Sequence, residues 1–394
     1  MRVRLLDLSG QYRSLEQEIR AAIDGVLSSQ RFILGPKLKE FEEAAARYCG
    51  ATHGIGISSG TDALLAVFMA LEIGIGDAVI TTAYSFFATG GCIARVGATP
   101  VFIDIEPDTY NISASALRHY VEKHCHIVEG RLINENRLLV RALMPAHLFG
   151  LCCDMNEMTA IAREHNLVLI EDAAQAIGAE FPLKNGHAKA GAMSDGGCFS
   201  FYPSKNLGAA GDAGLIVCQH DEFAERIRLC RNHGMGEQYR HDFVGGNFRM
   251  DELQAAILNV KLPYLDKWST ARREAAKFYT DEIERAGLRQ KVGLPVEPYA
   301  NSGLKNHHIY HQYVIRTPKR DALRQHLADR EIETAVYYPL ALNQQPCFEY
   351  LGYKPGDFPE AERAARETLA LPIYPEIPRE AQQYVVNCIA EFFG

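Results

Sequence analysis

The amino-acid sequence predicts an α/β fold, with a large domain built on a mostly parallel sheet and a smaller α+β domain at its C-terminal end. Short apolar strands alternate with helical segments between residues 54 and 218. Such alternation is typical of crossover units, in which helices cover both faces of a parallel sheet. After Lys261 the pattern changes, and 394 residues fit two structural units better than one. We therefore expect a large domain over residues 1–260 and a small domain over residues 261–394.

The large domain begins with a helical segment, because Leu15, Ile19 and Val26 recur at helical spacing. A second helix is expected over residues 36–48. The expected strands cover residues 54–57, 78–82, 100–105, 139–145, 167–170, 198–201 and 214–218. The helices expected between them cover residues 61–71, 86–96 and 155–165. One polar insertion, residues 129–137, is expected to be a solvated surface segment.

The small domain is expected to contain a long charged helix over residues 264–286 and a stretch rich in proline, glycine and asparagine up to residue 306. A strand over residues 310–316 and a helix over residues 321–330 follow. This mixture of elements is typical of a small α+β unit.

The composition excludes several classes of protein. The net charge is −8 and no long run of lysine or arginine occurs, so a basic face for nucleic acid is not expected. Asp7 interrupts the region where a secretory signal needs apolar residues, and residues 78–94 are too polar for a membrane span. Ten cysteines without C-x-x-C spacing predict reduced thiols, including the adjacent Cys152 and Cys153. We expect a cytoplasmic globular protein.

Residues that follow the strands are the candidates for a site, because α/β sheets bind ligands at the carboxyl ends of parallel strands. The segment 58–62, Ser-Ser-Gly-Thr-Asp, precedes a helix and is either a phosphate seat or an ordinary N-cap. Asp172 follows an apolar strand, where a carboxylate is costly without a cation or donors. It would suit pairing with a protonated ring nitrogen, unless it caps the next helix.

Lys205 lies in a loop after another apolar strand, with Phe201 and Tyr202 beside it. Partial loss of hydration lowers the pKa of such a lysine and frees its amine for imine formation. Residues 245–256 form a loop that enters a helix, where Asn247 either caps the helix or contacts a ligand. Three features follow one another along the chain: a phosphate-binding helix N-terminus, an acid at a strand end and a lysine. This order is the arrangement of a pyridoxal-phosphate (PLP) enzyme of the aspartate-aminotransferase-like fold, fold type I.

At this point the sequence resembles the DegT/DnrJ/EryC1/StrS family of nucleotide-sugar aminotransferases, over residues 8–375. The matching motifs are Ser-Gly-Thr-Asp-Ala-Leu (59–64), Pro-Ala-His-Leu-Phe-Gly (145–150), Glu-Asp-Ala-Ala-Gln-Ala (171–176), Ser-Phe-Tyr-Pro-Ser-Lys (200–205), Arg-Asn-His-Gly (231–234), the segment 247–256 and Tyr-Pro (338–339). The resemblance implies a PLP-dependent enzyme that converts a keto group of a dTDP- or UDP-linked sugar to an amino group. It also implies glutamate as donor, and it favours a 3-keto over a 4-keto sugar.

The resemblance implies a role for each matching residue. Lys205 and Asp172 would be catalytic, the lysine as Schiff-base former and proton shuttle and the aspartate as partner of the pyridine nitrogen. Gln175 would hydrogen-bond the ring oxygen, and Phe86 would stack on the ring. The resemblance implies that Gly60, Thr61 and Ser200 contact the cofactor phosphate. It also implies that Asn247 reaches this phosphate from the partner subunit. The last contact implies a homodimer with shared sites.

Substrate contacts are implied for His308, His311 and Tyr338, whose segments border the sugar-nucleotide site in the family. No metal site is expected, because the histidines at 307, 308 and 311 have no fourth ligand beside them. Residues 337–339 and 343–346 depart from the family's frequent His-Tyr-Pro and His-Leu-Gln-Pro forms, which leaves the sugar open. The alternatives are a PLP-dependent sugar dehydratase, in which histidine replaces the lysine, and a non-catalytic or regulatory member of the same fold. The lysine at position 205 favours transamination.

Overall fold

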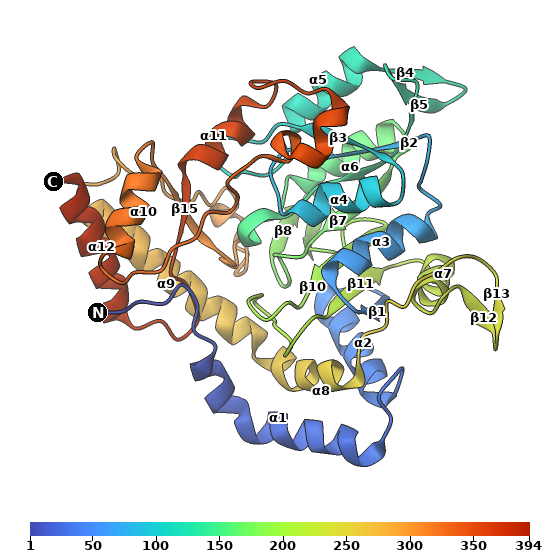
Figure 1. Ribbon diagram of the computed structural model, residues 1–394, viewed down its shortest axis with the longest axis horizontal. Coiled ribbons are helices and arrows are strands. Elements are labelled where there is room, and N and C mark those ends of the chain that lie inside the picture. Colours follow the sequence, from blue (N-terminus) through green and yellow to red (C-terminus); the bar gives the residue numbers. More distant parts are fainter.

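The structure, a computed structural model, describes residues 1–394 and contains one nine-stranded sheet (Figure 1). Seven of its strands follow the order β1-β11-β10-β7-β6-β2-β3, and the hairpin β4–β5 joins β6. The strands are β1 (His53–Ile57), β2 (Asp77–Thr82), β3 (Thr99–Ile103), β4 (Cys125–Val128), β5 (Arg131–Asn134), β6 (Leu139–Met144), β7 (Val168–Asp172), β10 (Gly196–Ser200) and β11 (Gly214–Cys218). All neighbours from β10 to β3 are parallel. The predicted α/β fold with a mostly parallel sheet is confirmed.

An antiparallel edge, formed by β11 and β1, completes the sheet. Residues 201–213 join β10 to β11 without a helix, and adjacent strands joined without a crossover run in opposite directions. Ser200 pairs with Gly214 in this register. The loop that carries Lys205 therefore begins and ends at the carboxyl end of β10.

Helices cover both faces of the sheet, because alternate residues of a strand point to opposite sides. In β2, Val79 belongs to one apolar cluster and Ile80 to the other. The first layer consists of α3 (Gly60–Ala70), α4 (Phe87–Arg95) and α7 (Asp221–Arg231). The second layer consists of α2 (Pro36–Cys49), α5 (Ala114–His124), α6 (Met155–Glu164) and α8 (Glu252–Lys261).

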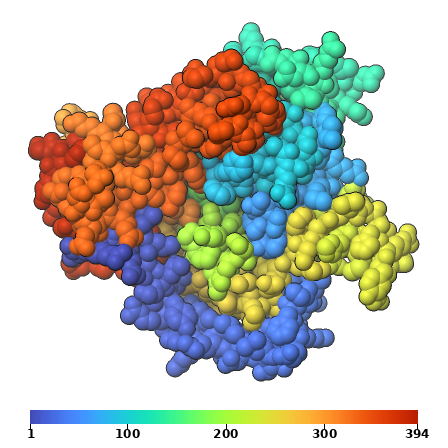
Figure 2. Space-filling model, viewed as in Figure 1, coloured from blue at the N-terminus to red at the C-terminus, as the bar shows by residue number.

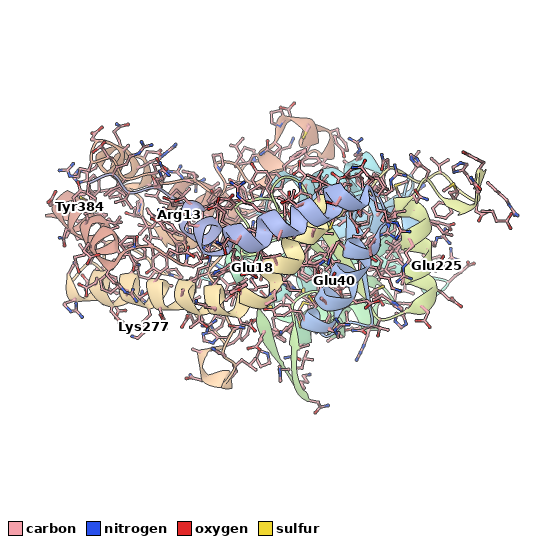
Figure 3. All side chains as sticks on the ribbon, turned by 90° about the horizontal axis from the view of Figure 1, so that it is seen from below. Arg13, Glu18, Glu40, Glu225, Lys277 and Tyr384 are labelled. Carbon is pink, nitrogen blue, oxygen red and sulfur yellow. The ribbon has the colours of Figure 1, made fainter.

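The N-terminal helix α1 (Ser9–Ser29) packs on the outside of α8 and presents Arg13 and Glu18 to solvent (Figure 3). The buried carboxylate of Glu252 accepts hydrogen bonds from the backbone N–H groups of Gly35 at 3.0 Å and Leu38 at 3.1 Å. A negative charge at a helix N-terminus is stabilising. The start of α2 is thus fixed by a residue more than two hundred positions away.

The C-terminal part combines α9 (Leu265–Arg285), α10 (Arg320–Ala328) and α12 (Arg379–Phe393) with the antiparallel pair β14 (Tyr313–Arg316) and β15 (Thr368–Leu371). These elements share a separate apolar cluster, which Val3 from the N-terminus joins. Another segment, which includes α11 (Pro359–Glu367), packs against β3 through Phe102, Phe348 and Phe358. Figure 2 shows this orange-red segment lying against the cyan segment that contains β3 and α4.

The remaining elements are short. They are the hairpins β8 (Glu180–Leu183) with β9 (Gly186–Lys189) and β12 (Met235–Glu237) with β13 (Arg240–His241), and the 3₁₀ turns Leu148–Gly150, Leu262–Tyr264, Ala300–Ser302, Leu342–Gln344 and Pro346–Leu351. The expected strand 310–316 begins only at Tyr313, because the backbone before it pairs with residues 149–151. None of the helices combines the length and the hydropathy that a bilayer span requires.

Candidate active site

A cavity of about 570 Å³ lies at the carboxyl ends of the parallel strands. Ser85, Ala146, Asp172 and Ser200 line it from positions at or just after the ends of β2, β6, β7 and β10. Ligands of α/β sheets bind at such places. The residues predicted from the sequence that line the cavity are Gly60, Thr61, Phe86, Asp172, Gln175, Ser200, Lys205, His311 and Tyr338.

Lys205 faces this cavity from the loop between β10 and β11. The next residue, Asn206, is anchored, since its amide nitrogen donates to the carbonyl of Ile309 at 3.1 Å. Burial of the ammonium group lowers the pKa of Lys205 to about 8, although the negative charge of Asp172 opposes the shift. A larger fraction of Lys205 than of a free lysine is therefore an uncharged amine at neutral pH.

His311 lies beside the lysine as a neutral ring. Burial, reinforced by the charges of Lys205 and Arg272, holds the pKa of His311 well below its usual range. Its Nδ1 lies 3.1 Å from Oδ1 of Asn206, an acceptor, so this nitrogen carries the proton. The Nε2 lone pair of His311 accepts from the side-chain amide of Gln312 at 3.4 Å, and both residues line the cavity.

Asp172 is held by its backbone and by its side chain. Its N–H donates to the carbonyl of Pro145 at 3.0 Å, and its carbonyl accepts from the N–H of His147 at 3.0 Å. Its carboxylate accepts from the Thr89 hydroxyl at 2.7 Å through Oδ2 and from the N–H of Ala174 at 3.2 Å through Oδ1. The residue is 7% exposed. The carboxylate is thus fixed in one orientation at the cavity wall.

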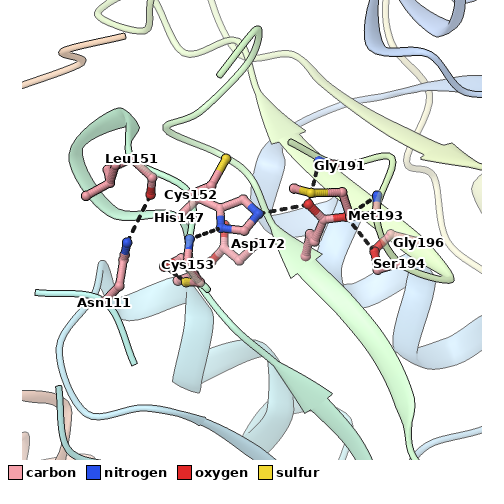
Figure 4. A network of polar contacts seen from close by, with 12 residues as sticks. Asn111, His147, Leu151, Cys152, Cys153, Asp172, Gly191, Met193, Ser194 and Gly196 are labelled. Atoms are coloured by element: carbon pink, nitrogen blue, oxygen red, sulfur yellow. Dashed lines mark hydrogen bonds and ion pairs between the residues drawn. The ribbon is translucent and has the colours of Figure 1, made fainter. Parts of the chain in front are cut away.

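Glu171, the residue before Asp172, is fully buried, and Figure 4 labels its four hydrogen-bond partners, His147, Gly191, Met193 and Ser194. Its carboxylate accepts four hydrogen bonds, from His147 Nε2 at 2.8 Å, Gly191 N at 2.7 Å, Met193 N at 2.8 Å and Ser194 Oγ at 2.8 Å. His147 Nδ1 accepts from the N–H of Cys153 at 3.1 Å, so its proton lies on Nε2. The network fixes residues 145–153 against the end of β7, directly behind Asp172.

We predict that Glu171→Gln destabilises the fold by about 3 kcal/mol, since an amide NH₂ would then face donors in a buried site. The midpoint and slope of urea unfolding measure this effect. Glu129→Gln, an exposed residue of the polar insertion, is the control and should leave the midpoint unchanged. Equal midpoints for both variants would show that the network adds no stability.

The N-terminus of α3 forms one end of the cavity. Ser59 caps the helix, because its hydroxyl accepts from the N–H of Asp62 at 3.0 Å. Gly60 and Thr61 line the cavity, and the first N–H groups of a helix lack partners within it, so they can bind an anion. A Cβ on Gly60 would lie only 2.7 Å from the Cβ of Ser200. Glycine at this position therefore allows the strand end and the helix start to meet.

An amide and two aromatic rings line the rest of the cavity. Gln175 accepts from the N–H of Phe149 at 2.8 Å and donates to the hydroxyl of Tyr338 at 2.9 Å. The Tyr338 hydroxyl has no acceptor in the protein, and burial raises its pKa, so its proton stays available to a ligand. Phe86 is 55% exposed, which leaves its ring free to stack on a bound group.

Two predicted site residues do not line the cavity. His308 is 3% exposed and stacks on Tyr310 with ring centroids 3.8 Å apart, contrary to the predicted substrate contact. Its Nδ1 accepts from the N–H of Tyr310, and burial lowers its pKa to about 3. Asn247 is exposed and lies outside the cavity of its own chain.

Several residues that line or support the cavity were not predicted, namely Ser85, Thr89, His147, Tyr202, Ser204, Asp212 and Gln312. The position after a strand could have indicated Ser85, but no sequence signal linked Thr89 to Asp172.

No group of three histidine, cysteine, aspartate or glutamate side chains is placed to hold a metal ion. All ten cysteines are free, and Cys152 and Cys153 are buried.

The family model described as the DegT/DnrJ/EryC1/StrS aminotransferase family matches residues 13–390. A relative from Geobacillus stearothermophilus, named a pleiotropic regulatory protein, is 48% identical across 100% of this chain and 99% of its own. A relative from Streptomyces venezuelae, named dTDP-3-amino-3,4,6-trideoxy-alpha-D-glucose transaminase, is 38% identical across 99% of this chain and 96% of its own.

Solved structures give the same result. The structure of DesV from S. venezuelae, in complex with a ketimine intermediate, matches with a TM-score of 0.89 and 37% identity, over 99% of this chain and 98% of that one. NtdA from Bacillus subtilis, with bound cofactor PMP, matches with a TM-score of 0.82 and 27% identity, over 96% and 82%. The predicted fold class and the dependence on pyridoxal phosphate are confirmed by these matches.

Proposed function

Because the chain belongs to the DegT/DnrJ/EryC1/StrS aminotransferase family, which depends on pyridoxal phosphate, we propose that it aminates a keto group of a nucleotide-linked sugar. The proposed donor is glutamate, the nucleotide is dTDP or UDP, and a 3-keto sugar is favoured over a 4-keto sugar. One observation carries this proposal: a single cavity brings together the low-pKa amine of Lys205, the carboxylate of Asp172 and the N-terminus of α3.

The residues of the cavity fit pyridoxal phosphate. The unpartnered N–H groups at the start of α3, together with the Ser200 hydroxyl, suit a phosphate, and Gly60 lets them approach it. Asp172 is an acceptor held in place, as a protonated pyridine nitrogen requires. The exposed ring of Phe86 suits a flat heteroaromatic face, and Lys205 supplies an amine for the aldehyde.

Pyridoxal phosphate, when bound, supplies an electron sink for negative charge on a substrate carbon. The side chains of this protein provide attachment, orientation and proton transfer. Lys205 Nζ would take the proton from the α-carbon of the donor and deliver it to the cofactor, a task that suits an amine with a pKa near neutrality. Asp172 would hold the proton on the ring nitrogen. Gln175 and the hydroxyl of Tyr338 would hold the ring oxygen.

The wall of the cavity supports a sugar as the acceptor. Gln312, Tyr337 and Tyr338, which come from the C-terminal part of the chain, provide an amide, hydroxyl groups and aromatic faces for a polyhydroxylated ring. The S. venezuelae relative is named as the transaminase of a 3-amino dTDP-sugar. This name supports the preference for a 3-keto substrate.

Charge supports a site shared between two subunits. Lys205 is the only lysine or arginine that lines the cavity, and Asp172 and Asp212 line it as well. Glutamate and a sugar nucleotide are both anionic, so one chain alone offers them too few cations. Exposed apolar side chains, including Phe32 and Ile33, are left for a partner to cover. We therefore propose a homodimer in which Asn247 of the partner subunit reaches the cofactor phosphate.

Mixing two inactive variants tests this arrangement, with Lys205→Ala in one subunit and Asn247→Ala in the other. If the site is shared, each mixed dimer has one site with both lesions and one intact site. Random exchange should then restore about a quarter of the wild-type activity, since half the dimers are mixed and half of their sites are intact. No recovery, with exchange verified by a tagged subunit, would place Asn247 in its own subunit's site or at a helix cap.

The reaction itself is tested by supplying glutamate with a panel of 3-keto and 4-keto nucleotide sugars and measuring release of 2-oxoglutarate. Turnover with a 3-keto member is expected, and turnover restricted to 4-keto sugars would reverse the proposed preference.

The name of the G. stearothermophilus relative supports a second candidate, a regulatory binding protein of the same fold. Such a protein would bind the sugar nucleotide without turnover. A dehydratase is less favoured, because the lysine is retained at position 205.

A further inference from the structure

We propose that Thr89 is a positioning residue for Asp172, and that Ser85 and Thr89 form a hydrogen-bond chain of fixed direction that holds the carboxylate toward the bound cofactor. This inference rests on the proposed function, because it concerns the contact between Asp172 and the pyridine nitrogen. The family resemblance assigned a role to neither hydroxyl.

The chain of hydroxyls begins where β2 ends. Ser85 lies two residues before α4 and lines the cavity, and Thr89 lies in the first turn of α4. Their oxygens are 2.8 Å apart. Thr89 is 0% exposed and reaches Asp172 Oδ2 at 2.7 Å, past the end of β6, which lies between β2 and β7.

The direction of each hydrogen bond follows from the acceptor at the end of the chain. An ionised carboxylate only accepts, so the Thr89 hydroxyl must donate to Asp172. Its single proton is then used, and the contact between the two hydroxyls requires Ser85 to donate to Thr89. A hydroxyl that accepts a hydrogen bond becomes a stronger donor, so Ser85 strengthens the bond from Thr89 to the carboxylate.

No other side chain donates to this carboxylate, since its remaining partner is the backbone N–H of Ala174 on Oδ1. Bonds to a charged acceptor are shorter and stronger than neutral ones. With both oxygens engaged, the carboxylate of Asp172 is held in one plane at the wall of the cavity. Without the Thr89 hydroxyl, the carboxylate would be free to turn about its last side-chain bond and would meet a ring nitrogen less often.

The test uses Thr89→Val, which keeps the shape of the side chain and removes the hydroxyl, in protein loaded with pyridoxal phosphate labelled with ¹⁵N in the ring. The ring-nitrogen chemical shift should move toward that of the unprotonated ring. The transamination rate should fall roughly ten- to hundredfold, the range expected for a hydrogen bond to a charged group. Thr89→Ser, which restores the hydroxyl, should recover both the ring-nitrogen chemical shift and the transamination rate of the wild type.

Thr81→Val is the matched control, because Thr81 is equally buried but donates to the carbonyl of Met144 at 2.7 Å, and neither residue lines the cavity. It should leave the ring-nitrogen shift unchanged. Ser85→Ala, which leaves Thr89 in place, should move the shift in the same direction as Thr89→Val by a smaller amount. In an Asp172→Asn background, Thr89→Val should add little further loss, since the two residues act as one unit.

An unchanged ring-nitrogen shift in Thr89→Val, or full additivity with Asp172→Asn, would overturn this inference while leaving the proposed function intact. A wild-type protein that binds no labelled cofactor would overturn the proposed function, and the inference with it. If Thr81→Val moved the ring-nitrogen chemical shift as much as Thr89→Val does, the loss of any buried hydroxyl in this layer would explain the change. That result would also contradict the inference.

Discussion

Replacing Lys205 with alanine should reduce amino transfer to below about 1% of the wild-type rate, because attachment of the cofactor and proton transfer use the same amine. The side chain faces a cavity and supports no other element, so the variant should keep its circular dichroism spectrum and unfolding midpoint. The rate is measured with glutamate and the best keto sugar of the panel. Reduction of the wild-type holoenzyme with borohydride should attach the cofactor to Lys205, as peptide mass spectrometry would show.

Lys261 provides the control for this experiment. It is also a buried lysine whose pKa is lowered to about 8 by burial, but its amine donates to the carbonyl of Gly208 and does not line the cavity. Lys261→Met should therefore keep the colour of the bound cofactor and its borohydride label at Lys205. Residual turnover above about 1% in Lys205→Ala, or a label on Lys261, would contradict the assignment.

Asp172→Asn should bind the cofactor with its colour retained but lose roughly a hundred- to a thousandfold in rate, about 3–4 kcal/mol of barrier, as when one preorganised electrostatic partner is removed. The asparagine cannot hold a proton on the pyridine nitrogen as a carboxylate does, so the electron sink is weakened. Single-turnover kinetics with glutamate measure the effect on the chemical step.

Asp195→Asn separates this effect from damage to the sheet. Asp195 accepts from the N–H of Leu169 at 2.8 Å near the start of β7, whereas Asp172 lies at its end. The control should turn over at a rate close to that of the wild type. If Asp172→Asn does the same, Asp172 is only a structural residue at the end of the strand.

Much of the fold could be predicted because its signals are local. Each strand of the parallel sheet is buried on both faces and is therefore a short run of apolar residues, and each ends within a few residues of the predicted position. The start of the strand near Tyr313 was less predictable, because Ile309 and Tyr310 are β-prone but the backbone around them pairs with residues 149–151. That contact depends on tertiary structure.

In the site, too, features set by the local sequence could be predicted and contacts between distant residues could not. Asp172 and Lys205 could be predicted because each follows an apolar strand, and parallel strands bring their ends together. The pairing of Thr89 with Asp172 spans 83 positions, and the bond between His147 and Glu171 spans 24, so neither follows from spacing along the chain. His308 was assigned to the substrate from its neighbourhood, whereas its aromatic stacking with Tyr310 directs the ring into the interior.

The central claim, that this protein moves an amino group from glutamate to a keto nucleotide sugar through pyridoxal phosphate, is tested most directly by the absorption spectrum of the purified holoenzyme in two half-reactions. We predict a yellow protein whose visible band is lost when glutamate is added and returns when a 3-keto dTDP- or UDP-sugar follows, with one equivalent of amino sugar formed per active site. A colourless protein that pyridoxal phosphate cannot restore, or a band that glutamate leaves unchanged, would contradict the claim.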